Sequence, residues 1–455
     1  MRRLTARFPR RSTDLCEAIG RAVNDHKNSR LLILSSKLGY QTRGFIDAAR
    51  RLGAEVALGT DRCHQLDDPW NDRAWPLEFA EAEAAAAEIV ARARDLPISA
   101  ILALGDRSPL AAALAARALG LPYNSPESVA NCRSKLRQRE VLAAAGVRVP
   151  RFFAFALTDS LEAILPRVNF PCVVKPLRLS ASQGVIRANG AAEFRAAVVR
   201  IQALVESPEV QVTRDAELDR VLVEEYVPGA EVAVEGLLDR GELRVLAIFD
   251  KPDPLEGPYF EETIYVTPSR MPAAAQAAIS ACARSTVAAL GLTHGPIHAE
   301  FRWNDRGAWV LECAPRPIGG LCAKTLRFGA ALMPLEELLV RHALGLPGSD
   351  AEREANAAAV MMIPVPASGI LDEVQGLDRA REVAHIEAIE ITARLRDRVV
   401  AWPEGASYLG FIFARAPRAE DAEAAVRAAH AELHFKLSAE LLVQHPATRR
   451  LPVRR

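Results

Sequence analysis

No apolar run in this chain approaches the roughly 18 residues that a membrane span requires. The first residues are basic rather than apolar, which does not match a secretory signal. The 455 residues include only seven cysteines, and no CxxC spacing occurs among them. A disulfide framework and a structural zinc site are therefore not expected, and a reducing cytoplasm is the predicted compartment.

An excess of charge of one sign is also missing. The 57 Lys and Arg residues balance the 57 Asp and Glu residues, so neither a nucleic-acid footprint nor an acidic tail is indicated. The phosphate-binding patterns GxGxxG and GxxxxGK[ST] do not occur. Cys63 and His64 form an adjacent pair, but two residues without further ligands do not predict a metal site.

What the chain does contain is alternating strands and helices over residues 30–130. Because strands separated by helices favour a parallel sheet, this region is expected to be an α/β unit. Asp106 follows its third strand and would face a ligand there, although a plain turn is the favoured interpretation. The predicted strands are 30–35, 55–59 and 100–105, and the predicted helices are 45–52, 77–94 and 109–119.

The rest of the chain mixes strands and helices less regularly. A helix is predicted at 134–145 and another at 419–433. Strand-like runs are 147–150, 170–176, 221–227, 231–238, 243–249, 357–364, 386–394 and 408–415.

A β-hairpin carrying two glutamates is predicted near residues 297–312, with its turn at 304–307. Side chains alternate along a strand, so His298 shares a face with Glu300, and Glu312 is expected opposite Glu300. Paired carboxylates repel unless a cation lies between them. Mg²⁺ suits this pair, because it takes carboxylate and phosphate oxygens.

Arg316 follows the hairpin in a loop that ends at Gly319-Gly320. Its guanidinium would bind a second anion beside the metal.

Two lysines are candidates for binding an anion. Lys175 leaves a buried strand before the small polar loop 180–184, whose backbone N–H groups would bind further oxygens. Lys135 opens a helix, where its charge opposes the helix dipole unless it faces an anion. Taken alone, each lysine is more simply a strand end or a solvated surface residue.

The run from Leu222 to Val232 is an apolar strand that turns at Pro228-Gly229. Its backbone would offer groups to a purine edge, and Glu231 would accept hydrogen bonds from ribose hydroxyls. By itself, the run is a charged edge strand with a turn.

Along the chain these features form four elements: Lys135, Lys175 with the loop 180–184, the run ending at Glu231, and the glutamate hairpin with Arg316. Their order and spacing resemble the ATP-grasp superfamily over roughly residues 30–435. The resemblance implies an α/β fold, α+β in parts, with ATP-grasp architecture. It comprises an N-terminal parallel α/β domain (1–130), a central ATP-grasp domain (131–335) and a C-terminal α+β subdomain (336–455). The nucleotide lid is expected within about 150–230.

The resemblance also implies roles for single residues. It gives ATP and Mg²⁺ as cofactors, with two ions expected and Mn²⁺ as a substitute. The implied site comprises Lys135, Lys175, Ser182, Gln183, Gly184, Glu224, Glu225, Tyr226, Val227 and Glu231 for ATP, Glu300 and Glu312 for the metal, and Arg316, Gly319 and Gly320 for the acyl phosphate or oxyanion.

One position departs from the family pattern. The family commonly has Glu-x-Asn-x-Arg here, whereas this chain has Glu312-Cys313-Ala314-Pro315-Arg316. Ala314 has no atom that can coordinate a metal. The second ion would then rest on Glu312 and phosphates, or bind more weakly.

Residues 249–269 resemble the L-amino-acid ligase and carnosine-synthase-like branch. This implies a ligase that activates a carboxylate as an acyl phosphate and joins it to an amine, both from amino acids. Lys251 would then be a third cation at the γ-phosphate, and Glu262 would face a substrate amino group. A structural role is equally open for both. His298 would contact the substrate, act as a base or support the carboxylates.

Two other functions stay open. One is an ATP-grasp carboxylase, or a purine-pathway ligase, that uses bicarbonate or another small nucleophile. The other is a catalytically impaired nucleotide-binding regulatory protein, which Ala314 alone favours. Small-molecule partners are expected, without nucleic acid or membrane, and a homodimer is expected only by analogy with relatives.

Overall fold

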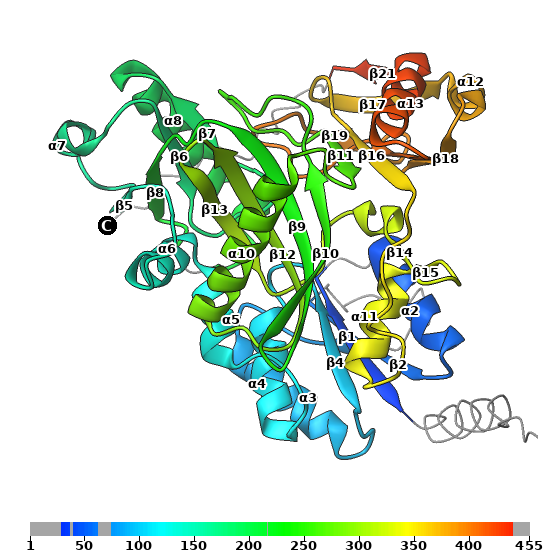
Figure 1. Ribbon diagram of the computed structural model, residues 1–455. Coiled ribbons are helices and arrows are strands. Elements are labelled where there is room, and N and C mark those ends of the chain that lie inside the picture. The colour runs from blue at the N-terminus through cyan, green and yellow to red at the C-terminus, as the bar shows by residue number, and fades with distance from the viewer. Residues whose placement is uncertain (1–28, 37–39, 62–73, 216, 440–455) are drawn as a thin grey trace, which may run out of the picture.

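The computed structural model describes residues 29–36, 40–61, 74–215 and 217–439 (Figure 1). The basic N-terminal residues and the Cys63-His64 pair lie outside these ranges. None of the helices within them combines the length and apolarity needed to cross a bilayer.

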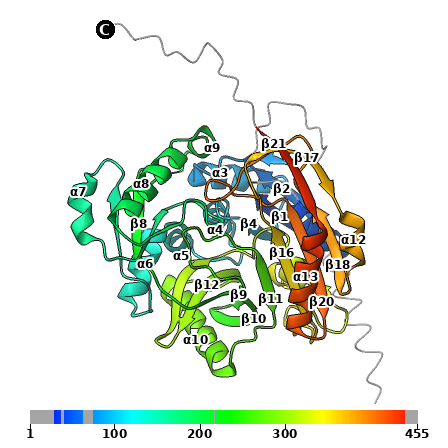
Figure 2. The same ribbon diagram turned by 90° about the horizontal axis from the view of Figure 1, so that it is seen from above.

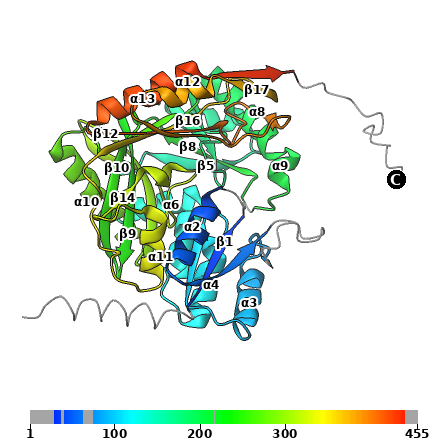
Figure 3. The same ribbon diagram turned by 90° about the vertical axis from the view of Figure 1, so that its right-hand side faces the viewer.

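Four parallel strands form the N-terminal sheet in the order β3-β2-β1-β4. Leu31 and Ile33 pack on one face, while Leu32 and Leu34 pack on the other. Helices cover both faces, so the strands read as continuous apolar runs and the predicted parallel sheet is confirmed. The elements are β1 (Arg30–Ser35), β2 (Glu55–Thr60), β3 (Trp75–Pro76), β4 (Ala100–Leu104), α2 (Tyr40–Arg51), α3 (Ala82–Ala93), α4 (Pro109–Leu119) and, later in the chain, α11 (Leu335–Ala343). Helices α2 and α11 lie side by side (Figure 3).

An eight-stranded sheet in the order β13-β12-β9-β10-β11-β16-β20-β18 forms the centre of the molecule. Strands from both sides of the predicted boundary at residue 335 share this sheet. Helix α10 (Ala273–Leu290) covers one face of it through Ile279 and Ala283. The strands are β9 (Ala230–Asp239), β10 (Glu242–Asp250), β11 (Ile264–Thr267), β12 (Gly295–Asn304), β13 (Gly307–Ala314), β16 (Ala357–Ile363), β18 (Ile386–Ile391) and β20 (Gly410–Ala416).

A separate sheet in the order β5-β8-β6-β7 lies across the molecule from the C-terminal helices (Figure 2). Phe194 and Ile201 of α8 pack against its apolar face. Its elements are β5 (Phe152–Ala156), β6 (Cys172–Pro176), β7 (Ile186–Ala188), β8 (Arg220–Glu225), α7 (Leu161–Ile164), η1 (Leu165–Arg167), α8 (Ala191–Val205) and α9 (Pro208–Gln211). Between this sheet and the N-terminal one in sequence come α5 (Pro126–Arg133) and α6 (Lys135–Ala144).

The C-terminal part adds a small sheet, β19-β17-β21, and packs α13 on the end of the central sheet. Its elements are β17 (Gly369–Gln375), α12 (Leu377–Glu382), β19 (Arg398–Val399), α13 (Ala419–Glu432) and β21 (His434–Ser438). Short connecting elements are η2 (Cys322–Thr325), β14 (Arg327–Phe328) and β15 (Met333–Pro334).

The structure differs from the predicted elements in several places, and helices α8 and α10 were not predicted. The run 147–150 is not a strand, because Val147 and Val149 pack against the central core from a loop, and the strand comes later as β5. Helix α5 was not predicted. It begins after Ser125, whose side chain accepts a hydrogen bond from Ser128 N at 3.1 Å.

Candidate active site between the sheets

The hairpin of β12 and β13 places its two glutamates opposite each other. Glu300 and Glu312 are register partners, as predicted, although a bulge after Glu300 shifts the pairing that follows. Ile297, Ala299 and Phe301 point into the core against α10. Because side chains alternate along a strand, burial of that apolar face fixes the direction of the carboxylates.

A row of polar side chains crosses from β12 to β9 on the carboxylate face. Arg302 lies opposite Glu231, and His298 lies opposite Glu235. Arg302 Nε donates to Glu231 at 3.0 Å, and His298 Nδ1 forms a buried hydrogen bond with Glu235. Strand pairing between distant parts of the sequence therefore gathers these groups into one site.

Lys251, directly after β10, neutralises part of this row. Its Nζ lies 2.8 Å from Glu231 and 3.1 Å from Glu300, and it also pairs with Glu262. Only 3% of the Lys251 side chain is exposed. Burial acts to lower the pKa of Lys251, but the three carboxylates raise it well above its usual range. The lysine is therefore a fixed cation in this structure.

The pKa values of the carboxylates around Lys251 shift in different directions. Burial acts to raise the pKa of Glu300, but the ammonium of Lys251 holds it well below its usual range. Burial raises the pKa of Glu262 to about 7; Lys251 opposes this shift and the charge of Glu300 adds to it. One oxygen each from Glu231, Glu262 and Glu300 lies within 4.8 Å of the others, so the set also fits a hard divalent cation.

Glu235 is a buried site residue that the sequence did not single out. Burial acts to lower the pKa of His298, but Glu235 raises it to about 9. The other carboxylate oxygen of Glu235 accepts a hydrogen bond from Ile318 N at 3.1 Å. Glu235 thereby positions both the histidine and the backbone before Gly319-Gly320. Its place on the face of Glu231, four residues earlier, was the available signal.

The segment predicted to hold adenine is anchored by neighbouring strands. Arg302 Nη1 donates to the Tyr226 hydroxyl at 3.1 Å and to the Val227 carbonyl at 2.9 Å. The side chain of Glu225 pairs with Arg151 at 2.7 Å. These contacts fix the end of the strand, and the side chains of Glu225 and Tyr226 are bonded to arginines.

Lys175 belongs to a buried group of three charges. Its Nζ lies 2.6 Å from Glu224 Oε2, and Arg139 Nε donates to Glu224 Oε1 at 2.6 Å. Burial acts to raise the pKa of Glu224, but Arg139 and Lys175 hold it below its usual range. Arg139, on α6, was not predicted; one buried arginine in a helix carries no sequence signal.

Lys135 and Glu312 meet in a cleft between α6, the loop after β6 and the end of β13. Lys135 Nζ lies 3.5 Å from Glu312 and donates to the Leu179 carbonyl at 2.6 Å. Ala314 also lines this cleft.

Arg316 enters the same cleft and pairs with Asp106, which follows β4. The second contact, from Arg316 Nη2 to Asp106 Oδ2, is 3.3 Å long. Burial acts to raise the pKa of Asp106, but Arg316 lowers it below its usual range. Asp106 therefore faces the site, where a plain turn had been the favoured interpretation.

The loop 180–184 adopts an unusual backbone and contacts the C-terminal part. Ala181 and Ser182 both have φ of 54° and Gly184 has φ of 72°. A side chain at Gly184 would also meet Pro176 at 3.0 Å. Gln183 Nε2 donates to the Glu404 carbonyl at 2.7 Å.

Comparison with protein families now adds independent evidence. Models described as ATP-grasp N-terminal domain, ATP-grasp domain and L-amino acid ligase C-terminal domain 2 match residues 46–123, 168–325 and 361–438. The chain belongs to the ATP-grasp superfamily.

Relatives support the same assignment. An uncharacterized protein of Sinorhizobium fredii, y4rH, is 26% identical over 71% of this chain and 65% of its own length. Alanine–anticapsin ligase of Bacillus amyloliquefaciens is 28% identical over 46% of each chain. The alignments thus span less than two thirds of either relative. The crystal structure of L-amino acid ligase from Bacillus licheniformis has a TM-score of 0.77 and 26% identity, covering 90% of this chain and 99% of that one.

Within this ATP-grasp frame, the predicted residues form connected groups. Lys251 joins Glu231, Glu262 and Glu300, whereas Lys135 joins Glu312. Lys175 with Glu224 lies on the separate sheet that carries the loop 180–184. The roles assigned to these residues by resemblance stay predictions.

Proposed function

We propose that the protein is an ATP- and Mg²⁺-dependent ligase that joins a carboxylate to an amine, both supplied by amino acids. The observation that carries this proposal is the opposed pair Glu300 and Glu312, each beside its own lysine, in a site that also holds Arg316. The likeness to L-amino acid ligase over 90% of the chain supports it.

The nucleotide would lie between the central eight-stranded sheet and the sheet formed by β5, β8, β6 and β7. Glu224 to Val227 would hold adenine through the backbone, because the side chains of Glu224 and Glu225 are already engaged with cations. Glu231 would accept the ribose hydroxyls. Lys135 and Lys175 would approach the phosphates, and the loop with Ser182 to Gly184 would shield them from water.

Glu300 and Glu312 would hold Mg²⁺. The metal would supply charge neutralisation on the phosphates and orient them for transfer. Lys251 would balance the charge of the carboxylates beside the γ-phosphate.

The chemistry has two steps. A carboxylate oxygen of the first substrate attacks the γ-phosphorus, breaking the bond to ADP and forming an acyl phosphate. The amine of the second substrate then attacks the carbonyl, and phosphate leaves with that carboxylate oxygen. Arg316 and the backbone near Gly319-Gly320 would stabilise the oxyanion.

The second substrate must reach this site as an amine. Glu262, with its pKa raised to about 7 by burial, exists in both forms near neutral pH. It would bind an ammonium when charged and accept its proton as attack begins. His298, fixed by Glu235, would support Glu300 rather than act as the base, because its pKa of about 9 keeps it protonated.

Two alternatives differ in a measurable way. A carboxylase or purine-pathway-type ligase would use bicarbonate or another small nucleophile in place of the amino acid amine. An impaired regulatory protein would bind nucleotide without turnover.

Transfer of ¹⁸O tests the proposed chemistry. With Mg-ATP and L-amino acids labelled in their α-carboxylates, released phosphate should carry one ¹⁸O per amide formed, and AMP should not appear. Unlabelled phosphate, or AMP as product, would contradict an acyl phosphate. Glu312→Gln should lose the transfer while keeping the fold, measured by circular dichroism.

A further inference from the structure

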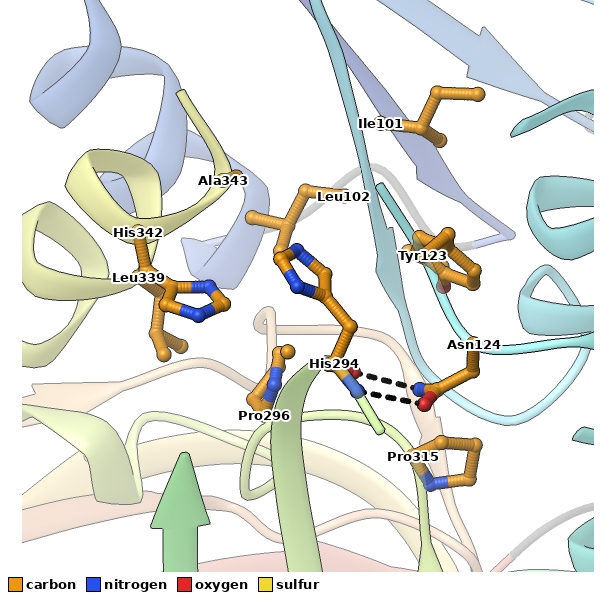
Figure 4. Close-up of a pocket in the computed structure, with 12 residues that line it drawn as sticks. Ile101, Leu102, Tyr123, Asn124, His294, Pro296, Pro315, Leu339, His342 and Ala343 are labelled. Atoms are coloured by element: carbon orange, nitrogen blue, oxygen red, sulfur yellow. Dashed lines mark hydrogen bonds between the residues drawn. The ribbon is translucent and has the colours of Figure 1, made fainter. Parts of the chain in front are cut away.

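A second polar cluster lies away from the candidate active site. Asp239 ends β9, His294 immediately precedes β12, and His342 lies in the last turn of α11. One potential ligand atom from each lies within 4.8 Å of the others. The imidazole rings lie side by side, with centroids 4.5 Å apart (Figure 4). Three elements from different parts of the fold therefore meet through these side chains.

His342 has the bonding pattern of a metal ligand. Its Nε2 is buried and has no hydrogen-bond partner in the described structure. The ring also has a hydrogen-bonding contact with the Leu238 backbone. Metal-binding histidines commonly donate one ring N–H to a backbone carbonyl and present the other nitrogen to the metal.

The cluster is held in place but remains accessible. Asn124 fixes the backbone of His294, donating to its carbonyl at 2.7 Å and accepting from its N–H at 3.0 Å (Figure 4). A small pocket adjoins the two rings. Asp239 pairs with Arg240 at 3.0 Å; both are largely exposed, so its carboxylate can turn at little cost.

We propose that Asp239, His294 and His342 bind one divalent transition-metal ion of the zinc class, with water as a further ligand. Two imidazole nitrogens and one carboxylate suit Zn²⁺, whereas Mg²⁺ prefers oxygen ligands throughout. The ion would tie the end of α11 to the ends of β9 and β12. This proposed metal site is independent of the proposed ligase chemistry.

The test uses the full chain, free of any affinity tag and stripped by a chelator. Zn²⁺ is titrated by calorimetry with Mg²⁺ in excess, so that carboxylate sites are filled. The wild type should bind one Zn²⁺ more than the double variant His294→Gln/His342→Gln, and zinc should raise only the wild-type Tm. Zinc bound elsewhere in the chain contributes equally to the wild type and the double variant, so it cancels when their stoichiometries are subtracted. His430→Gln, a partly buried histidine on α13, should bind as the wild type does.

Equal zinc stoichiometry in the wild type and the double variant would overturn the proposal. If the double variant fails to fold, Asp239→Asn decides the matter, because Asp239 is exposed. This change should weaken zinc binding about tenfold or more while leaving the Tm in chelator unchanged. Unchanged zinc affinity in Asp239→Asn would reject the three-residue site.

Discussion

Glu300 and Glu312 face each other across β12 and β13, yet each is neutralised by a different lysine. Glu300 lies 3.1 Å from Lys251, and Glu312 lies 3.5 Å from Lys135. Two opposed carboxylates, each with its own lysine, form a negatively charged site that a metal ion could bind. The proposed Mg²⁺ site rests on this pair.

Replacing Lys251 tests whether it balances the carboxylates. Lys251→Met leaves three partly buried acidic side chains without their shared cation, so the free energy of unfolding should fall by about 3 kcal/mol, measured by urea denaturation. Millimolar Mg²⁺ should recover part of this loss by binding the same carboxylates.

The matched control is Lys324→Met, which removes an ion pair with Glu390 whose partners are 43% and 35% exposed. It should cost less than about 1 kcal/mol and show no Mg²⁺ recovery. Equal losses of unfolding free energy in Lys251→Met and Lys324→Met would mean that Lys251 contributes no more to stability than an exposed lysine.

The pair of Arg316 and Asp106 links the loop after β13 to the N-terminal sheet. Arg316→Lys should lower kcat about 100-fold or more, because a lysine cannot keep the guanidinium geometry at the oxyanion. Asp106→Asn should lower kcat less, about tenfold, by loosening the arginine.

Arg415→Lys is the control, since Arg415 also forms a buried ion pair, with Glu354, but outside the site. It should reduce stability and leave kcat within about twofold. A full kcat for Arg316→Lys in steady-state assays would remove this residue from the chemistry.

Ala314 stands where a metal-binding asparagine is common in the family. It lines the cleft with Glu312 and lies opposite His298 in the register. Ala314→Asn adds an oxygen ligand, so the Mg²⁺ concentration for half-maximal turnover should fall about tenfold. Ala314→Leu adds volume without an oxygen and should not lower it. The same Mg²⁺ response in both variants would show that the departure at Ala314 is unrelated to the metal.

Glu336 gives a pH-dependent stability prediction away from the site. It lies against Gly44, and burial raises its pKa. A raised carboxyl pKa means that the folded state binds the proton more tightly, so stability falls as pH rises above the ordinary value of 4.5. Glu336→Gln should therefore stabilise the protein at pH 7, by on the order of 1 kcal/mol, and flatten the slope between pH 4.5 and 7.

Glu337→Gln, on the same helix, is the control because Glu337 is already paired with Arg341 at 2.9 Å. It should not increase stability. Chemical denaturation at several pH values distinguishes the two; a destabilised Glu336→Gln would mean that the carboxylate has a stabilising partner.

Local patterns predicted the hairpin, its register and its buried face. The alternation of Ile297, Ala299 and Phe301 with His298 and Glu300 is sufficient for that, because one face must enter the core. The apolar runs of the N-terminal sheet are equally informative, since both of its faces are covered.

Non-local pairing was beyond the sequence. The link between His298 and Glu235 depends on β9 and β12 being neighbours, although β10, β11 and α10 lie between them in the chain. The same holds for Arg139 with Glu224, which joins a helix to a strand. The cluster of Asp239, His294 and His342 likewise unites three separate elements and has no contiguous motif.

The proposed ligase reaction is tested best by measuring ADP release with Mg-ATP across single and paired amino acids, with the product mass recorded. We expect turnover that requires two amino acids, a product mass equal to their sum minus water, and loss of turnover in Glu312→Gln. Turnover with one acid plus bicarbonate, or ATP binding without turnover for any pair, would contradict it.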